Sequence, residues 1–135
     1  MKAVDANVLV RLLVQDDDAQ YRSALAFFDS LSTGSPAHID PVVLCELVWV
    51  LRASYDYARE EVAEVIERIL STEQLEVGDP ESVWLALEDF RASKADFADC
   101  LIGRRAERAG CSATVTFDGR LKSLPTFEIL RHAEG

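Results

Sequence analysis

Apolar and polar positions along this chain form two kinds of pattern, which predict helices separated by short strands. Apolar residues recur at helical spacing over 6–14, 17–31, 41–53, 59–70, 80–92 and 96–109. Short apolar runs between these segments predict strands at 2–4, 37–39, 75–77, 113–116 and 127–130. Strands that alternate with helices favour a mostly parallel sheet covered by helices on both faces. The pattern therefore predicts an α/β fold.

Helix boundaries are marked by capping residues. Asp40-Pro41 and Asp79-Pro80 each place a capping acid before a proline at the first helical position. Gly110 follows the segment over 96–109, where glycine commonly ends a helix in the left-handed conformation. These signals make the helix predictions more specific than apolar spacing alone.

Length and composition indicate one globular domain. The chain has 135 residues, of which 49% are hydrophobic and 28% charged. No apolar run reaches the roughly 20 residues that a membrane span needs, and the first residues lack a signal-peptide core. The three cysteines form no Cys-x-x-Cys pair and are expected to be small buried hydrophobes. We therefore expect a cytoplasmic protein without a membrane segment.

The formal net charge is −10. This excess of acids argues against a broad nucleic-acid-binding face, which is normally basic. It does not exclude a nuclease, because active-site acids contribute to the charge and a bound cation reverses the field locally. It also suits a basic or arginine-bearing protein partner.

Four acids stand beside apolar sequence, where an acid is locally out of place: Asp5, Glu46, Asp99 and Asp118. A carboxylate that is partly buried is costly unless it is paired or binds a metal. Asp5 and Asp118 directly follow predicted strands, and ligands of parallel sheets bind beyond the carboxyl ends of the strands. The four acids together predict one site for a hard cation.

Each acid also has a structural interpretation. Asp5 is equally well explained as a helix cap, and Asp118-Gly119 as a turn. Asp96 is expected to cap the helix that carries Asp99 and to serve as an outer metal ligand. Glu46 is the hardest to explain structurally, because its neighbours on a helix, Val42, Trp49 and Val50, are apolar.

Four segments, in this order and spacing, resemble the PIN-domain family, in particular the VapC-type toxin ribonucleases of VapBC toxin–antitoxin systems. They are Val4-Asp5-Ala6-Asn7-Val8-Leu9; Glu46-Leu47 followed by Val50-Leu51-Arg52; Ala95-Asp96-Phe97-Ala98-Asp99-Cys100-Leu101-Ile102; and Thr116-Phe117-Asp118. The resemblance extends over residues 1–135 as a single PIN domain. It implies a three-layer α/β/α sandwich with a mostly parallel central sheet.

The resemblance also implies a function, a metal-dependent endoribonuclease. Its carboxylates would hold Mg²⁺ or Mn²⁺, and a metal-activated water would hydrolyse RNA phosphodiester bonds. It implies an RNA substrate, a cognate VapB-type antitoxin and a homodimer. The residues carried over are the catalytic and metal-binding Asp5, Glu46, Asp99 and Asp118, the outer ligand Asp96, and the supporting Asn7 and Thr116.

Cations are still needed to hold RNA. Arg11 and Arg52 lie near the motifs and are the candidates for contacts to RNA or antitoxin. Further basic residues follow Asp99 and Asp118 on the chain: Arg104, Arg105, Arg108, Arg120 and Lys122. For any one of these residues, Arg11 and Arg52 included, a solvated surface charge is the favoured interpretation.

Other functions fit the same pattern less well. A non-catalytic metal- or partner-binding PIN module would bind metal without cleaving RNA. A phosphatase of the haloacid-dehalogenase type usually needs a second aspartate two residues after the first, where this chain has Asn7. A receiver domain would need a late lysine after a strand, which the layout lacks.

Overall fold

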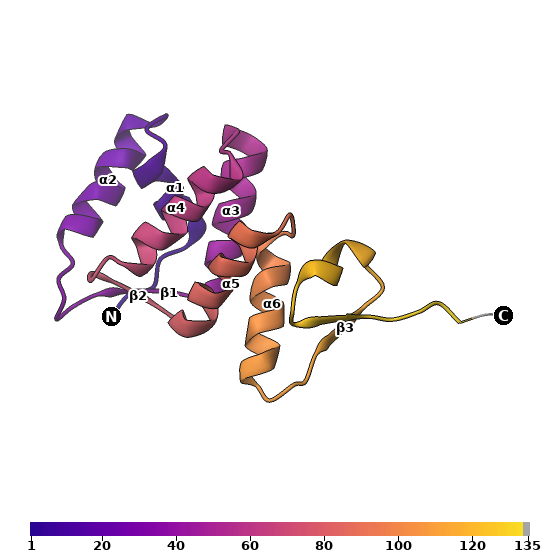
Figure 1. Ribbon diagram of the computed structural model, residues 1–135. Helices are drawn as coiled ribbons and strands as arrows, with labels where there is room; N and C mark the ends of the chain where they lie inside the picture. The colour runs from indigo at the N-terminus through magenta and orange to yellow at the C-terminus, as the bar shows by residue number, and fades with distance from the viewer. Residues whose placement is uncertain (134–135) are drawn as a thin grey trace. The chain divides into compact units, whose positions relative to one another are not determined.

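The computed structural model describes residues 1–133, which form two compact units (Figure 1). The first unit spans residues 1–80, and the second begins at Glu81. Six α-helices and parallel strand pairs place the chain in the α/β class, as predicted.

The first unit contains four helices and one parallel strand pair. Its elements are α1 (Ala6–Leu13), α2 (Asp18–Asp29), β1 (Ala37–Ile39), α3 (Pro41–Tyr55), α4 (Arg59–Leu70) and β2 (Leu75–Val77). Strands β1 and β2 pair in parallel, with Ala37 opposite Leu75 and Ile39 opposite Val77. These six elements correspond closely to the segments that helical apolar spacing and short apolar runs predicted.

The strand predicted at residues 2–4 is wrong in extent. Only Ala3 pairs with β1, through a single parallel bridge to His38. The amide of Val4 donates to the carbonyl of His38 at 3.0 Å, and the amide of His38 donates to the carbonyl of Lys2 at 2.8 Å. The segment still runs beside β1 and delivers Asp5 to the start of α1.

Aspartates begin three helices of this unit. Asp5 accepts a hydrogen bond from the amide of Val8, Asp17 from Gln20 and Asp40 from Val42. Each carboxylate satisfies an amide that has no partner within its helix. In α3, the side chains of Leu44, Leu47 and Leu51 are fully buried and fix which face of the helix is turned inward.

The second unit is built on two helices and a second parallel strand pair. Its elements are α5 (Pro80–Ala92), α6 (Phe97–Arg108), β3 (Thr114–Thr116), the 3₁₀ helix η1 (Gly119–Ser123) and β4 (Phe127–Ile129). Strands β3 and β4 pair in parallel, with Thr114 opposite Phe127 and Thr116 opposite Ile129. Gly110 has a φ of 97°, which confirms the predicted left-handed helix end.

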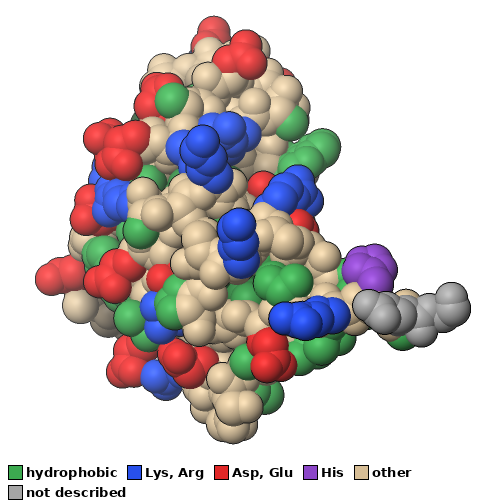
Figure 2. All heavy atoms as spheres, turned by 45° about the vertical axis from the view of Figure 1, so that its right-hand side comes forward, with side chains coloured by type: hydrophobic (Ala, Val, Ile, Leu, Met, Phe, Trp, Pro, Cys, Tyr) green, Lys and Arg blue, Asp and Glu red, His purple; other side chains and the backbone are tan. Residues whose placement is uncertain are grey.

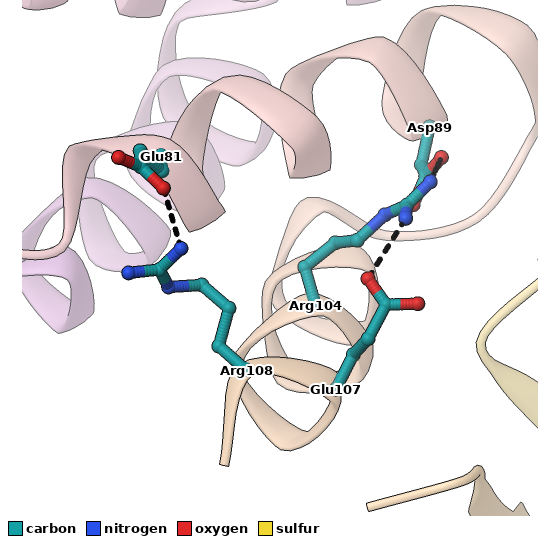
Figure 3. A network of polar contacts seen from close by, with 5 residues as sticks. All are labelled: Glu81, Asp89, Arg104, Glu107 and Arg108. Carbon is teal, nitrogen blue, oxygen red and sulfur yellow. Dashed lines mark hydrogen bonds and ion pairs between the residues drawn. The ribbon is translucent and has the colours of Figure 1, made fainter. Parts of the chain in front are cut away.

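An ion pair joins the two helices of the second unit (Figure 3). Arg104 of α6 binds the carboxylate of Asp89 in α5 through Nε–Oδ2 (2.7 Å) and Nη2–Oδ1 (2.9 Å). Arg104 also reaches Glu107 at 3.1 Å, and Arg108 reaches Glu81 at 2.5 Å. Two of the arginines that we considered for RNA therefore neutralise acids of their own unit.

Two side chains packed closely against the backbone of α6 explain a glycine in this helix. A Cβ added at Gly103 would lie 2.1 Å from Thr126 Oγ1 and 2.9 Å from Phe127 Cε2. Glycine at this position lets α6 pack directly against the start of β4, which keeps the helix that carries Asp99 close to the β3–β4 pair.

Three sequence predictions need revision or remain open. Only Cys100 is buried, whereas Cys45 is half-buried and Cys111 exposed. The strands pair as two separate two-stranded sheets, so the single central sheet and the single domain stay predictions. Within residues 1–133, every helix is too short or too polar to cross a membrane.

Candidate carboxylate site

Three predicted site residues of the second unit line one pocket. Asp96 precedes α6, Asp99 lies in its first turn, and Asp118 follows β3. The same pocket is lined by Lys94 and Arg120. The helix start and the strand end thus bring these three carboxylates together, as their positions in the sequence predicted.

The charges in this pocket affect one another. Burial raises the pKa of the Asp99 carboxyl above its ordinary value, and the charges of Asp96 and Asp118 raise it further. Arg120 opposes this effect on Asp99. Hydrogen bonds from the Arg120 side chain hold the pKa of Asp118 below its ordinary value. Repulsion among three acids is the kind of cost that a bound cation relieves.

Thr116 shapes the turn that presents Asp118. Its Oγ1 accepts a hydrogen bond from the amide of Asp118 at 3.0 Å. Asp118 in turn accepts from the amide of Arg120 at 2.9 Å, so it caps η1. The turn interpretation of Asp118 is therefore confirmed, and Asp118 also lines the pocket, while its role as a metal ligand stays a prediction.

The prediction that Asp96 caps α6 is wrong in one respect. Asp96 occupies the N-cap position, but its side chain accepts no capping hydrogen bond. A capping rotamer would turn the carboxylate toward the helix amides. In the structure the exposed carboxylate lines the pocket beside Asp99 instead, so its predicted part as an outer ligand stays a prediction.

Asp5 and Asn7 belong to a different pocket, in the first unit. Asp5 Oδ1 accepts from the amide of Val8 at 3.3 Å, which confirms the capping interpretation. Asp5 and Asn7 line this pocket together with Arg11 and Gln20. Asn7 thus lies close to Asp5, as its predicted supporting role requires.

Glu46 lies on the exposed face of α3. Val42 and Trp49, four residues before and three after, are 56% and 69% exposed, so apolar side chains surround the glutamate on an uncovered surface. Asp5 and Glu46 are both exposed, which contradicts our premise that each acid is partly buried. The premise failed because an apolar sequence around an acid does not reveal which helix face the core covers.

The two arginines proposed to contact RNA differ in their partners. Arg11 donates to Gln20 Oε1 at 2.7 Å and to Asp16 Oδ1 at 2.5 Å. Tyr55 and Asp16 raise the pKa of its guanidinium, with Tyr55 the larger cause. Arg52 is exposed and donates to the carbonyl of Tyr57 at 3.2 Å. Arg11 therefore has a structural role within its unit.

The donor set of the second-unit pocket fits a hard divalent cation. Asp96, Asp99 and Asp118 supply the carboxylate oxygens that Mg²⁺ and Mn²⁺ favour. Within residues 1–133, however, no three His, Cys, Asp or Glu side chains are arranged to hold one metal ion as they stand. In the same pocket, the Arg120 guanidinium contacts both oxygens of Asp118.

Basic residues are distributed in a way that the sequence did not reveal. On the face drawn in Figure 2, Lys and Arg side chains lie in several separate places among acidic and apolar ones. The ion pair between Asp89 and Arg104 could not be read from the chain, since the two residues are separated by 15 positions. The contact of Arg120 with Asp118 is local, and its signal was an arginine two residues after a turn aspartate.

Comparison with known proteins gives two matches. The PIN domain family model matches residues 2–126. A VapC ribonuclease of Aquifex aeolicus (strain VF5) is 30% identical over 125 residues, which cover 92% of this chain and 92% of that protein. No solved structure matches the chain.

Proposed function

This chain belongs to the PIN-domain family, and from that premise we propose that it is a metal-dependent endoribonuclease that hydrolyses RNA phosphodiester bonds. The observation that carries the proposal is the pocket of Asp96, Asp99 and Asp118, in which three acids meet and burial and repulsion raise the pKa of Asp99. The similarity to a VapC ribonuclease over nearly the whole chain supports the same activity.

The proposed metal ligands are Asp99 and Asp118, with Asp96 as an outer ligand. Asp5 and Glu46 complete the proposed catalytic set on the strength of their match to the family motifs. A bound Mg²⁺ or Mn²⁺ would lower the pKa of a coordinated water and offset the negative charge of the scissile phosphate.

The side chains of this protein would position the reactants. Thr116 holds the turn that aims Asp118, and the first turn of α6 holds Asp99 next to Asp96. Asn7 lies beside Asp5 and would orient its carboxylate or a water molecule. No nucleophile from the protein is required, because a water attacks the phosphorus. The products would carry a 5′-phosphate and a 3′-hydroxyl.

We also propose the biological setting that the VapC similarity suggests. The chain would act as the toxin of a toxin–antitoxin pair in the cytoplasm, as a single PIN domain and as a homodimer. A VapB-type antitoxin would place a basic segment on the acids, in keeping with the net charge of −10. Val42 and Trp49 of α3 form exposed apolar surface that a dimer interface could cover. Sedimentation of a Trp49→Ser variant tests this by measuring whether the variant still dimerises.

Arg11 and Arg52 remain candidates for contact with RNA or antitoxin. Because Arg11 already binds Asp16 and Gln20, Arg11→Ala should lower stability, whereas Arg52→Ala should leave the urea midpoint unchanged and weaken binding alone. Unchanged cleavage and antitoxin affinity in both variants would remove these residues from the proposed interface.

The alternative function is a non-catalytic PIN module that binds metal or a partner. Exposure of Asp5 and Glu46 is compatible with it, since neither acid is buried in a closed site. The two functions differ in one measurable property, which is the cleavage of RNA.

The experiment is cleavage of total cellular RNA by the purified protein, free of partners, with Mn²⁺ or Mg²⁺. We expect discrete fragments that are lost with EDTA and in Asp99→Asn. Glu88→Gln, which changes an exposed acid of α5 outside the motifs, should cleave like the parent. A folded protein that binds Mn²⁺ but leaves the RNA intact would support the non-catalytic module instead.

A further inference from the structure

Arg120 contacts Asp118 through two guanidinium nitrogens and its backbone amide. Its Nε lies 3.0 Å from Asp118 Oδ1, and its Nη2 lies 2.9 Å from Oδ2. The amide of Arg120 donates to the same Oδ1 at 2.9 Å. One arginine thus occupies both carboxylate oxygens of a proposed metal ligand.

This guanidinium is held by charge rather than by packing. The Arg120 side chain is 88% exposed, compared with 31% for Asp118. The contact with Arg120 is the main cause of the lowered pKa of Asp118. The charges of Asp96 and Asp99 in turn help to raise the pKa of the Arg120 guanidinium. An exposed pair of this kind is weak, and an arginine on a flexible stem can leave it without disturbing a core.

We propose that Arg120 is an exchangeable cation of the carboxylate pocket. In the metal-free protein it neutralises Asp118. When a divalent cation takes that carboxylate, the guanidinium is displaced and binds a phosphate oxygen of the RNA. This proposal rests on the proposed ribonuclease function and assigns Arg120 a place in substrate binding that depends on the metal.

Charge and geometry support the exchange. With Asp118 bound to a divalent cation, the guanidinium would face that positive charge at close range and would be repelled. Phosphate oxygens offer the same two-point geometry that Asp118 offers, which a planar guanidinium matches better than an ammonium group does. Arg120 lines the pocket with Asp99 and Asp118, so a phosphate bound at the metal would come within its reach.

The first measurement is the affinity for Mn²⁺ without RNA, which is read from the electron paramagnetic resonance signal of free Mn²⁺. Arg120→Ala should bind Mn²⁺ about two- to fivefold more tightly, the ratio that corresponds to an exposed ion pair. Arg120→Lys, which keeps the charge but loses the two-point contact, should fall between the two. Lys122→Ala, which removes an exposed cation of the same 3₁₀ helix, is the matched control and should stay close to the parent.

The second measurement is binding of a fluorescein-labelled single-stranded 12-mer RNA by anisotropy, in a Glu46→Gln background that suppresses cleavage. With Mn²⁺, Arg120→Ala should bind about threefold or more weakly, and its log–log salt slope should fall by about 0.7. With EDTA, where Arg120 is engaged by Asp118, the variant and the parent should bind equally.

The outcomes separate this proposal from the ribonuclease proposal. Equal Mn²⁺ affinity in the parent and Arg120→Ala, or an equal loss of RNA affinity with and without metal, would overturn the exchange even in an active ribonuclease. An inactive protein in which Arg120→Ala still tightens Mn²⁺ binding would instead leave the displacement intact and refute the proposed function.

Discussion

The ion pair between Arg104 and Asp89 should be a main stabilising contact of the second unit. The side chains of Arg104 and Asp89 are 17% and 9% exposed, and two parallel hydrogen bonds join them. Loss of one partner from a buried pair costs about 3–5 kcal/mol, because the other charge is left without compensation. Because Arg104 is still partly exposed, we expect a value at the lower end of this range. We therefore predict that Arg104→Met lowers the free energy of unfolding by about 3 kcal/mol.

Arg108→Met is the matched control, because it makes the same substitution one turn further along α6. Arg108 pairs with Glu81 at 2.5 Å, but the two side chains are 46% and 75% exposed. Exposed pairs contribute about 0–1 kcal/mol, so this variant should lose little stability. Figure 3 shows both pairs side by side.

Urea unfolding measures the difference. Trp84 of α5 reports on the second unit by fluorescence once Trp49 is replaced by phenylalanine. A loss of about 3 kcal/mol corresponds to a midpoint shift of roughly 1–3 M urea. Combining Arg104→Met with Asp89→Leu should recover much of the loss, because no unpaired charge remains. Equal losses in Arg104→Met and Arg108→Met would refute the reasoning.

Two further predictions concern α6 and the pocket. Gly103→Ala should destabilise the protein by about 1–3 kcal/mol in thermal melts, because its Cβ would lie 2.1 Å from a side-chain oxygen, whereas Gly34→Ala, which meets nothing within 4 Å, should not. Arg120→Ala should raise the pKa of Asp118 in a carbon-13 carboxyl titration of the metal-free protein. Because the folded-state pKa of Asp118 is below the ordinary aspartate value, the contact with Arg120 stabilises the folded protein at pH values above that ordinary pKa, and this stabilisation is lost as the pH falls. Arg120→Ala should therefore be less stable than its parent at pH 7 and equally stable in strong acid. An unchanged Asp118 titration would contradict the assigned cause.

Local signals in the sequence predicted most elements well. The amphipathic pattern gave α4 its observed bounds, Arg59–Leu70, and the short apolar run gave β2 as Leu75–Val77. The capping aspartate before Pro41 correctly marked the start of α3. These features depend on neighbours within a few residues, which is why the sequence alone reveals them.

Features set by packing were not predictable. Glu46 was placed on the correct helix, but its exposure depends on which face of α3 the core covers. Asp96 was placed at the correct N-cap, but its side-chain rotamer leaves the helix amides and lines the pocket. The pairing of Asp89 with Arg104 depends on how α5 packs against α6, and no local pattern encodes it.

The most direct test of the account measures whether acids from motifs far apart in the chain serve one reaction. Metal-dependent RNA cleavage would be compared for Asp5→Asn, Asp99→Asn and the double variant, with Glu64→Gln, an exposed acid of α4, as the control. We predict that each single change lowers kcat/KM about a hundredfold or more, and that the double variant is hardly worse than the poorer single one. Full activity in either single variant, or losses that multiply in the double variant, would contradict a shared catalytic role.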